Sequence, residues 1–129
     1  MKYTGKFDLE DRLVDFAVLI LNLAEKLPKS YAGIHLAKQI IRSGTSPALQ
    51  YGEAQAAESR PDFIHKMKIG LKELRETMIC LKIIIKKGFL KASMVEDAKV
   101  ENNELISIFV KSIETAHDNL RRGRKSRSG

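Results

Sequence analysis

Residues that could carry out catalysis or bind a metal are few and dispersed in this chain of 129 residues. The histidines are His35, His65 and His117, and only Glu114 and His117 have the spacing of a ligand pair in a di-metal bundle site. Such a site needs a second pair and two further inward carboxylates, and the sequence contains no second pair. The single cysteine, Cys80, has apolar neighbours, which raise a thiol pKa and make it unreactive. We therefore expect no catalytic residues, no metal and no cofactor, and a protein that is not an enzyme.

Basic residues are the more informative group. Lys and Arg number 23 against 16 Asp and Glu, which gives a formal net charge of +7. The excess falls in residues 60–91 and in residues 121–129, and the second of these ranges contains no acid. Rows of Lys and Arg attract nucleic-acid phosphates. The candidate nucleic-acid-binding residues are Lys66, Lys68, Lys72, Arg75, Lys111, Arg121, Arg122, Arg124, Lys125 and Arg127.

Nearby acids separate these candidates from the other lysines. In an antiparallel helix pair, an acidic stripe on the fourth segment would lie beside Lys82 and Lys86, so we expect ordinary interhelical ion pairs there. The stripe consists of Asp97, Glu101 and Glu104. The candidates in residues 66–75 would have no counter-charge and would make one end of the subunit positive. No aromatic residue is interleaved with them, so we expect contact with backbone phosphates and not stacking on bases. The alternative is a solvated basic terminus without a ligand.

Four helical segments would position these residues. Apolar residues recur at spacings of three and four along the chain, which is the period of a helix, and no stretch alternates at period two. We expect helices near residues 8–26, 31–58 and 61–87. A fourth helix would begin at Ser93, which forms a capping box with Glu96.

Pro47 lies inside the second segment, where it removes a backbone hydrogen bond to the carbonyl of Ser43. We expect the second helix to be kinked near Pro47, or to restart with Ser46 as its N-cap. Four helices with short connections favour an all-α fold, an antiparallel up-down-up-down four-helix bundle. We assign residues 1–120 to the bundle and residues 121–129 to a basic C-terminal tail.

Two of the segments carry more apolar surface than a bundle core needs. In the first, Val14, Val18 and Leu21 lie opposite the main seam of apolar residues. In the third, Ile83 and Ile84 fall outside the main seam. A monomer that exposed all of these side chains would carry a large apolar patch. We expect them to be buried between copies in a homo-oligomer; a thicker core with a few exposed isoleucines is the alternative.

A line of polar residues follows one face of the second segment. It consists of Gln39, Arg42, Ser46, Gln50 and Glu53. Arg42 and Glu53 lie about three turns apart, which is too far for a pair within one helix. The line is therefore either a solvated face or a half-buried hydrogen-bonded network that fixes the register between helices or subunits.

The same segment carries a recognisable motif. The run from Gln39 to Ala54 resembles the signature of the large-subunit ribosomal RNA intervening-sequence protein family, also called the four-helix-bundle protein family. The matching residues are Gln39, Arg42, Ser43, Gly44, Thr45, Ser46, Tyr51, Glu53 and Ala54. Gln50 stands where the family has Asn, and Ile41 stands where a second Arg is frequent.

This resemblance implies an antiparallel four-helix bundle that assembles as a ring-like homopentamer and has no catalytic activity. Relatives are encoded within intervening sequences of bacterial ribosomal RNA genes. A similar bundle, the accessory protein of diversity-generating retroelements, binds nucleic acid and a reverse transcriptase.

Two functions are therefore expected from the sequence. The first is a non-enzymatic, oligomeric accessory protein that binds the backbone of RNA or DNA, with a protein such as a reverse transcriptase as a further partner. The second is a protein-interaction scaffold or structural oligomer with no nucleic-acid role. The longest apolar run, residues 16–21, is far shorter than the ~20 residues that span a bilayer, and the first residues lack a secretion signal. We expect a cytoplasmic protein with no membrane contact.

Overall fold

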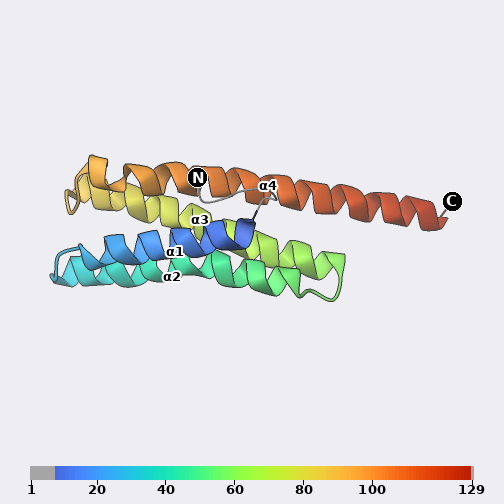
Figure 1. The fold of residues 1–129 in the computed structure, drawn as a ribbon, viewed down its shortest axis with the longest axis horizontal. Coiled ribbons are helices and arrows are strands. Elements are labelled where there is room, and N and C mark those ends of the chain that lie inside the picture. The colour runs from blue at the N-terminus through green and yellow to red at the C-terminus, as the bar shows by residue number, and fades with distance from the viewer. Residues whose placement is uncertain (1–7, 129) are drawn as a thin grey trace.

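The computed structural model describes residues 8–128 of the backbone and the side chains of residues 8–123. It contains four helices, α1 (Leu9–Glu25), α2 (Tyr31–Gln55), α3 (Arg60–Lys87) and α4 (Ala92–Ser128), and no strand within this range. Consecutive helices run in opposite directions, and α4 continues beyond the end of the other three (Figure 1). The predicted all-α four-helix bundle is confirmed.

Side chains and one glycine define most of the helix ends. The Asp8 side chain accepts a hydrogen bond from the Asp11 backbone N–H at 3.1 Å, which makes Asp8 the N-cap of α1. Gly88 ends α3 with a φ of 81°, a left-handed conformation that glycine adopts without strain. The predicted capping box of α4 is wrong, because this helix begins at Ala92 and Ser93 lies inside its first turn.

Helix α2 passes through Pro47 as one continuous element. The alternative of a restart capped by Ser46 is therefore wrong, while the kink near Pro47 stays a prediction. The helix tolerates the lost hydrogen bond because Pro47 is buried, and tertiary packing of one face supplies most of a helix's stability.

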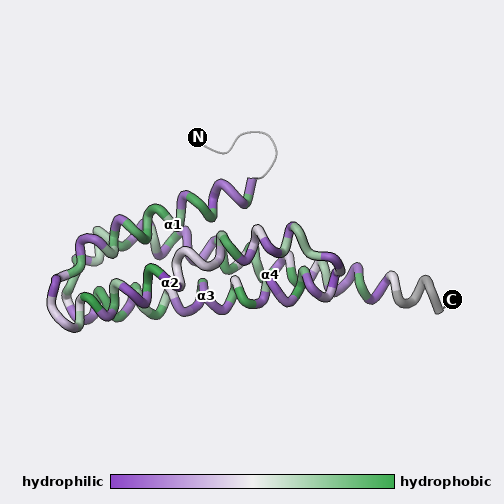
Figure 2. The backbone as a smooth tube through the Cα atoms, turned by 90° about the horizontal axis from the view of Figure 1, so that it is seen from below, coloured by the Kyte–Doolittle hydropathy of each residue, from purple (hydrophilic) through white to green (hydrophobic). Residues whose placement is uncertain are grey.

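The core is a seam along the inner face of each helix. Each helix packs on its neighbours in chain order, α1 and α4 contact each other least, and no close backbone approach joins α1 to α3 or α2 to α4. Apolar and hydrophilic residues recur along every helix, as expected if one face of each is buried (Figure 2). The buried seam of α1 consists of Leu9, Leu13, Phe16, Ile20 and Leu23, and Leu27 continues it just after the helix ends.

One core position of α4 is polar. Asn102 is fully buried, and its side-chain Nδ2 donates a hydrogen bond to the Leu74 carbonyl of α3 at 3.0 Å. Its Oδ1 has no hydrogen-bond partner. A buried amide that bonds one particular carbonyl penalises any sliding of α4 along α3, because sliding would break that bond.

Glycines allow the closest helix contacts. A Cβ placed on Gly44 of α2 would lie 2.6 Å from a methyl carbon of Ile20 on α1, and a Cβ on Gly70 of α3 would lie 2.6 Å from the Phe109 ring on α4. Both distances are far below a van der Waals contact. These glycines therefore set how closely α1 approaches α2 and α3 approaches α4.

Two glycines of α2 give a matched test of this packing. Gly44→Ala places a methyl group against Ile20 and should lower the free energy of unfolding by about 1–3 kcal/mol. Gly52→Ala adds the same methyl group where nothing lies within 4 Å, and it should raise the free energy of unfolding by about 0.5–1 kcal/mol. Urea unfolding followed by circular dichroism measures both. Equal effects of the two substitutions would show that the α1–α2 contact is not tightly packed.

Candidate functional site

Three exposed basic residues follow the outer face of α3. Lys68, Lys72 and Arg75 border a shallow depression that is also lined by Leu71, Glu76 and Ile79. Within residues 8–123 none of the three forms an ion pair. They span about 10 Å along the helix, since each residue rises about 1.5 Å. We call Lys68, Lys72 and Arg75 the α3 basic row.

Two other predicted nucleic-acid candidates have acidic partners. The Lys66 ammonium lies 2.9 Å from the Glu53 carboxylate of α2, and this hydrogen bond raises the pKa of Lys66. The expectation that Lys66 lacks a counter-charge is therefore wrong. Arg121 pairs with Asp118 one turn earlier on α4. The positive charge at this end of the bundle is thus partly neutralised.

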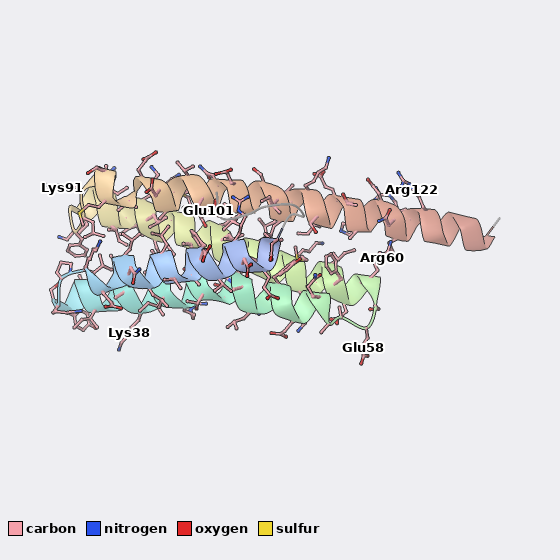
Figure 3. All side chains as sticks on the ribbon, in the orientation of Figure 1. Lys38, Glu58, Arg60, Lys91, Glu101 and Arg122 are labelled. Carbon is pink, nitrogen blue, oxygen red and sulfur yellow. The ribbon has the colours of Figure 1, made fainter. Side chains whose placement is uncertain are left out.

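The remaining candidates are distributed over α4. Lys111 lines a groove with Leu9 and Tyr51, so it faces α1 and α2 and does not join the α3 basic row. Arg122 is exposed on the part of α4 that extends past the bundle (Figure 3). The side chains of Arg124, Lys125 and Arg127 lie outside the described residues.

The acids of α4 pair with α1 and not with α3. Arg12 of α1 donates to Glu101 at 3.0 Å from its Nε, and its guanidinium lies 3.8 Å from Glu104. Glu101 projects from α4 in Figure 3. The expected ion pairs of Lys82 and Lys86 with these acids are therefore wrong, and both lysines are exposed on α3.

The polar line of α2 faces α3. The Arg42 guanidinium lies 3.3 Å from both Glu73 and Glu76 of α3, and it also hydrogen-bonds to Gln39 at 3.4 Å. Deeper in the same contact, the Thr77 hydroxyl donates to Ser43 at 2.9 Å. These bonds join two helices within one subunit.

The other members of the polar line lie farther along α2. Glu53 holds Lys66 of α3, as described above, and Ser46 is half-buried. The Oε1 of Gln50 is buried without a hydrogen-bond partner, and Gln50 is the position where the family pattern has Asn. A role for this line between subunits stays a prediction.

Glu73 is a charged residue that sequence reasoning did not single out. Only 8% of its surface is exposed. Burial, and then the neighbouring carboxylate of Glu76, raise the pKa of Glu73, while the charge of Arg42 opposes this. The available signal was its position: Glu73 and Thr77 lie one turn apart, on the side of α3 that faces α2.

The surplus apolar residues divide into exposed and buried groups. Val14 and Val18 of α1 are 49% and 50% exposed, and Ile83 of α3 is 45% exposed. Leu21 is half-buried. Ile84 is 1% exposed inside the subunit core, so its assignment to an interface between copies is wrong.

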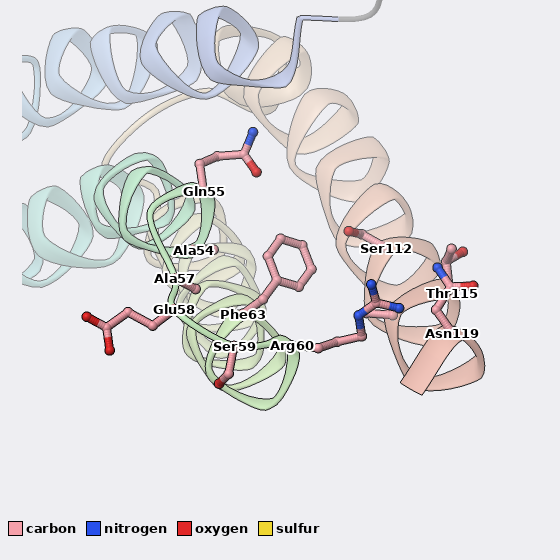
Figure 4. A pocket seen from close by; sticks show the side chains of 11 residues that line it. Ala54, Gln55, Ala57, Glu58, Ser59, Arg60, Phe63, Ser112, Thr115 and Asn119 are labelled. Carbon is pink, nitrogen blue, oxygen red and sulfur yellow. The ribbon is translucent and has the colours of Figure 1, made fainter. Parts of the chain in front are cut away.

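A groove lies between the α2–α3 connection and α4. It has a volume of about 650 Å³, and Phe63 and Ser112 are among its lining residues. Glu58, its one carboxylate, points away from the groove, whereas the Arg60 guanidinium extends toward α4 (Figure 4). No histidine or cysteine lines it, so the groove lacks a paired nucleophile and base. In the described part of the chain no three potential metal ligands cluster, and no helix is long and apolar enough to cross a membrane.

The sequence matches the 23S rRNA-intervening sequence protein family over residues 6–111. The chain belongs to this family. A protein of unknown function from the S23 ribosomal protein family of Bacteroides thetaiotaomicron is 34% identical in sequence to this chain. Its crystal structure superposes on this structure with a TM-score of 0.78. The superposition covers 82% of this chain and 98% of the Bacteroides chain. No curated relative matches the chain.

The raised pKa of Glu73 predicts how stability depends on pH. A carboxyl with a raised pKa binds its proton more tightly in the folded than in the unfolded chain. Stability therefore falls as the pH rises from the ordinary value of 4.5 through the raised pKa. Glu73→Gln should raise the free energy of unfolding at pH 7, and this gain should vanish once the pH falls below the ordinary carboxyl pKa of 4.5.

Urea unfolding at several pH values measures this difference. Glu58→Gln, at an exposed position in the α2–α3 connection, removes the same charge and should show no such pH-dependent gain. A Glu73→Gln variant that is less stable at pH 7 would show that the ion pair with Arg42 outweighs the cost of burial.

Proposed function

We propose that this intervening-sequence family member is a non-enzymatic, oligomeric accessory protein that binds RNA or DNA through backbone phosphates. The observation that carries the proposal is the α3 basic row, whose three cations are exposed and form no ion pair within residues 8–123. The family's name connects it with 23S ribosomal RNA, which makes RNA the first ligand to test.

The chemistry of the row suits phosphate binding. Lys and Arg side chains at one-turn spacing can follow a phosphate backbone, and released counterions then contribute most of the binding free energy. No aromatic side chain lines the depression beside the row, so the contact would position a nucleic acid without reading its bases. Arg122 and the basic end of α4 supply further positive charge.

Assembly of several copies is the second part of the proposal. The half-exposed valines of α1 and isoleucines of α3 support it, because soluble monomers rarely expose such groups together. A ring-like pentamer in the cytoplasm, with a reverse transcriptase as protein partner, is the form that the family resemblance favours. A protein-interaction scaffold without nucleic acid is the alternative that the same apolar residues support.

Removing the α3 basic row tests the nucleic-acid part. A variant with Lys68, Lys72 and Arg75 changed to Gln should bind a 23S intervening-sequence RNA more weakly than the unchanged protein. The slope of log affinity against log salt should also fall in magnitude by about 2–3, because roughly three phosphate contacts are lost. Fluorescence anisotropy between about 50 and 200 mM salt measures both quantities.

The control removes the same charge elsewhere. Lys26, Lys29 and Lys38 are exposed around the α1–α2 connection, and changing them to Gln should leave most of the affinity and the slope intact. If both triple variants lose the same affinity, binding follows net charge and the α3 basic row is not the site.

A further inference from the structure

We propose that copies of the chain join through two different surfaces, the outer face of α1 on one copy and the outer face of the second half of α3 on the next. This inference rests on the proposed oligomer and specifies its contact. It commits to a second copy of this chain as the occupant of both faces, because the two faces complement each other in charge.

The outer face of α1 is apolar along its middle and acidic at its edges. Val14 and Val18 lie one turn apart and are about half exposed. Glu10, Asp11 and Glu25 are exposed on the same helix. Arg12, the basic residue within α1, turns to the other side and contacts Glu101 of α4. The outer face of α1 therefore presents negative charge around an apolar strip.

The outer face of α3 has the same form with the opposite charge. Ile79 and Ile83 also lie one turn apart, and they are 56% and 45% exposed. Lys82 and Lys86 line a shallow depression with these two isoleucines, and neither lysine has an ion pair within residues 8–123. Glu73 of α3 is buried against Arg42 of α2, whereas the half-buried Glu76 pairs with the same guanidinium and also borders the depression beside Ile79.

The two faces fit each other better than either fits itself. Two α1 faces would place acids against acids, and two α3 faces would place lysines against lysines, which is repulsive. An α1 face on an α3 face buries both apolar pairs and places carboxylates beside ammonium groups. Each apolar pair is separated by four residues, so one helix can lie along the other with two apolar contacts.

The position of the helices makes this contact heterologous. Helices α1 and α3 lie on opposite corners of the bundle, because each contacts α2 and α4 but not the other. One copy can therefore present an α1 face to one neighbour and an α3 face to another. Repetition of such a contact gives a closed ring when the rotation closes and a filament when it does not. The α3 basic row lies nearer the start of α3, outside the central part of the proposed contact.

Mixing two variants tests this arrangement directly. Val18→Glu blocks the α1 face and Ile83→Glu blocks the α3 face. Each variant alone should be dispersed into small species by light scattering. An equimolar mixture should form a 1:1 dimer with twice the monomer mass and nothing larger, because one intact face of each kind remains. Both substitutions lie at half-exposed positions, and circular dichroism verifies that each variant is folded.

Two control variants identify other modes of assembly. Val100→Glu, at a 48% exposed position of α4, should leave the wild-type oligomer intact. An oligomer that survives Ile83→Glu but not Val18→Glu would indicate an α1–α1 contact and overturn the proposal. So would an oligomer dispersed by Ile41→Glu on α2 but by neither of the first two variants.

Charge reversal gives an independent test. When the two apolar pairs are aligned antiparallel, Asp11 of one copy lies beside Lys86 of the next. Asp11→Lys should therefore weaken the oligomer, and adding Lys86→Glu to the same chain should restore it. Failure of this rescue would contradict the pairing. A wild-type protein that is monomeric would instead contradict the proposed oligomer itself. RNA binding by the variant of the α3 basic row is measured in a separate experiment. The proposed RNA binding and the proposed contact between copies can therefore fail independently.

Discussion

Each helix of a four-helix bundle can bury only the faces that meet its two neighbours, and the rest of the structure depends on this limit. In α1 the buried face is complete, from Leu9 to Leu27. Apolar side chains beyond it, such as Val18, stay at the surface because no helix of the same subunit reaches them. Their exposure is therefore a consequence of the architecture and cannot be removed by repacking the core. Within this architecture, only another molecule could cover them.

The α2–α3 contact determines which charges reach the surface. Arg42 draws Glu73 and Glu76 to the side of α3 that faces α2. The outer face of α3 is then predominantly basic, with Glu76 at its edge paired to Arg42. The Ser43–Thr77 hydrogen bond lies in the same contact and resists rotation of either helix. Internal ion pairing thus leaves an excess of positive charge on this face.

The sequence was sufficient for the elements and for the α1 seam, because both follow from local apolar periodicity and capping. The sequence was insufficient for α3, because one stripe of apolar residues spaced three and four apart accounts for only one buried face. Helix α3 packs against both α2 and α4 and buries a wider face. Glu73 and Ile84 are buried on the side facing α2, and a single-stripe reading leaves both outside the core. Partners of long charged side chains were also missed, since Lys66 reaches Glu53 across 13 positions of sequence. Such pairs depend on helix register, which the Asn102 and glycine contacts fix only in the folded chain.

Electrostatic pairing inside the subunit also explains why α1 and α3 differ so sharply. Arg12, the one basic residue of α1, forms an ion pair with Glu101 of α4. The Arg12 side chain therefore points toward α4, and Glu101 points toward α1 and not toward α3. Lys82 and Lys86 are consequently left without the partners that a simple antiparallel pairing of α3 with α4 would give them. The Arg12–Glu101 ion pair therefore directs the one base of α1 toward the inside of the subunit, and the outer face of α1 keeps its acids while the outer face of α3 keeps its lysines. This difference in charge is the basis of the head-to-tail contact proposed above.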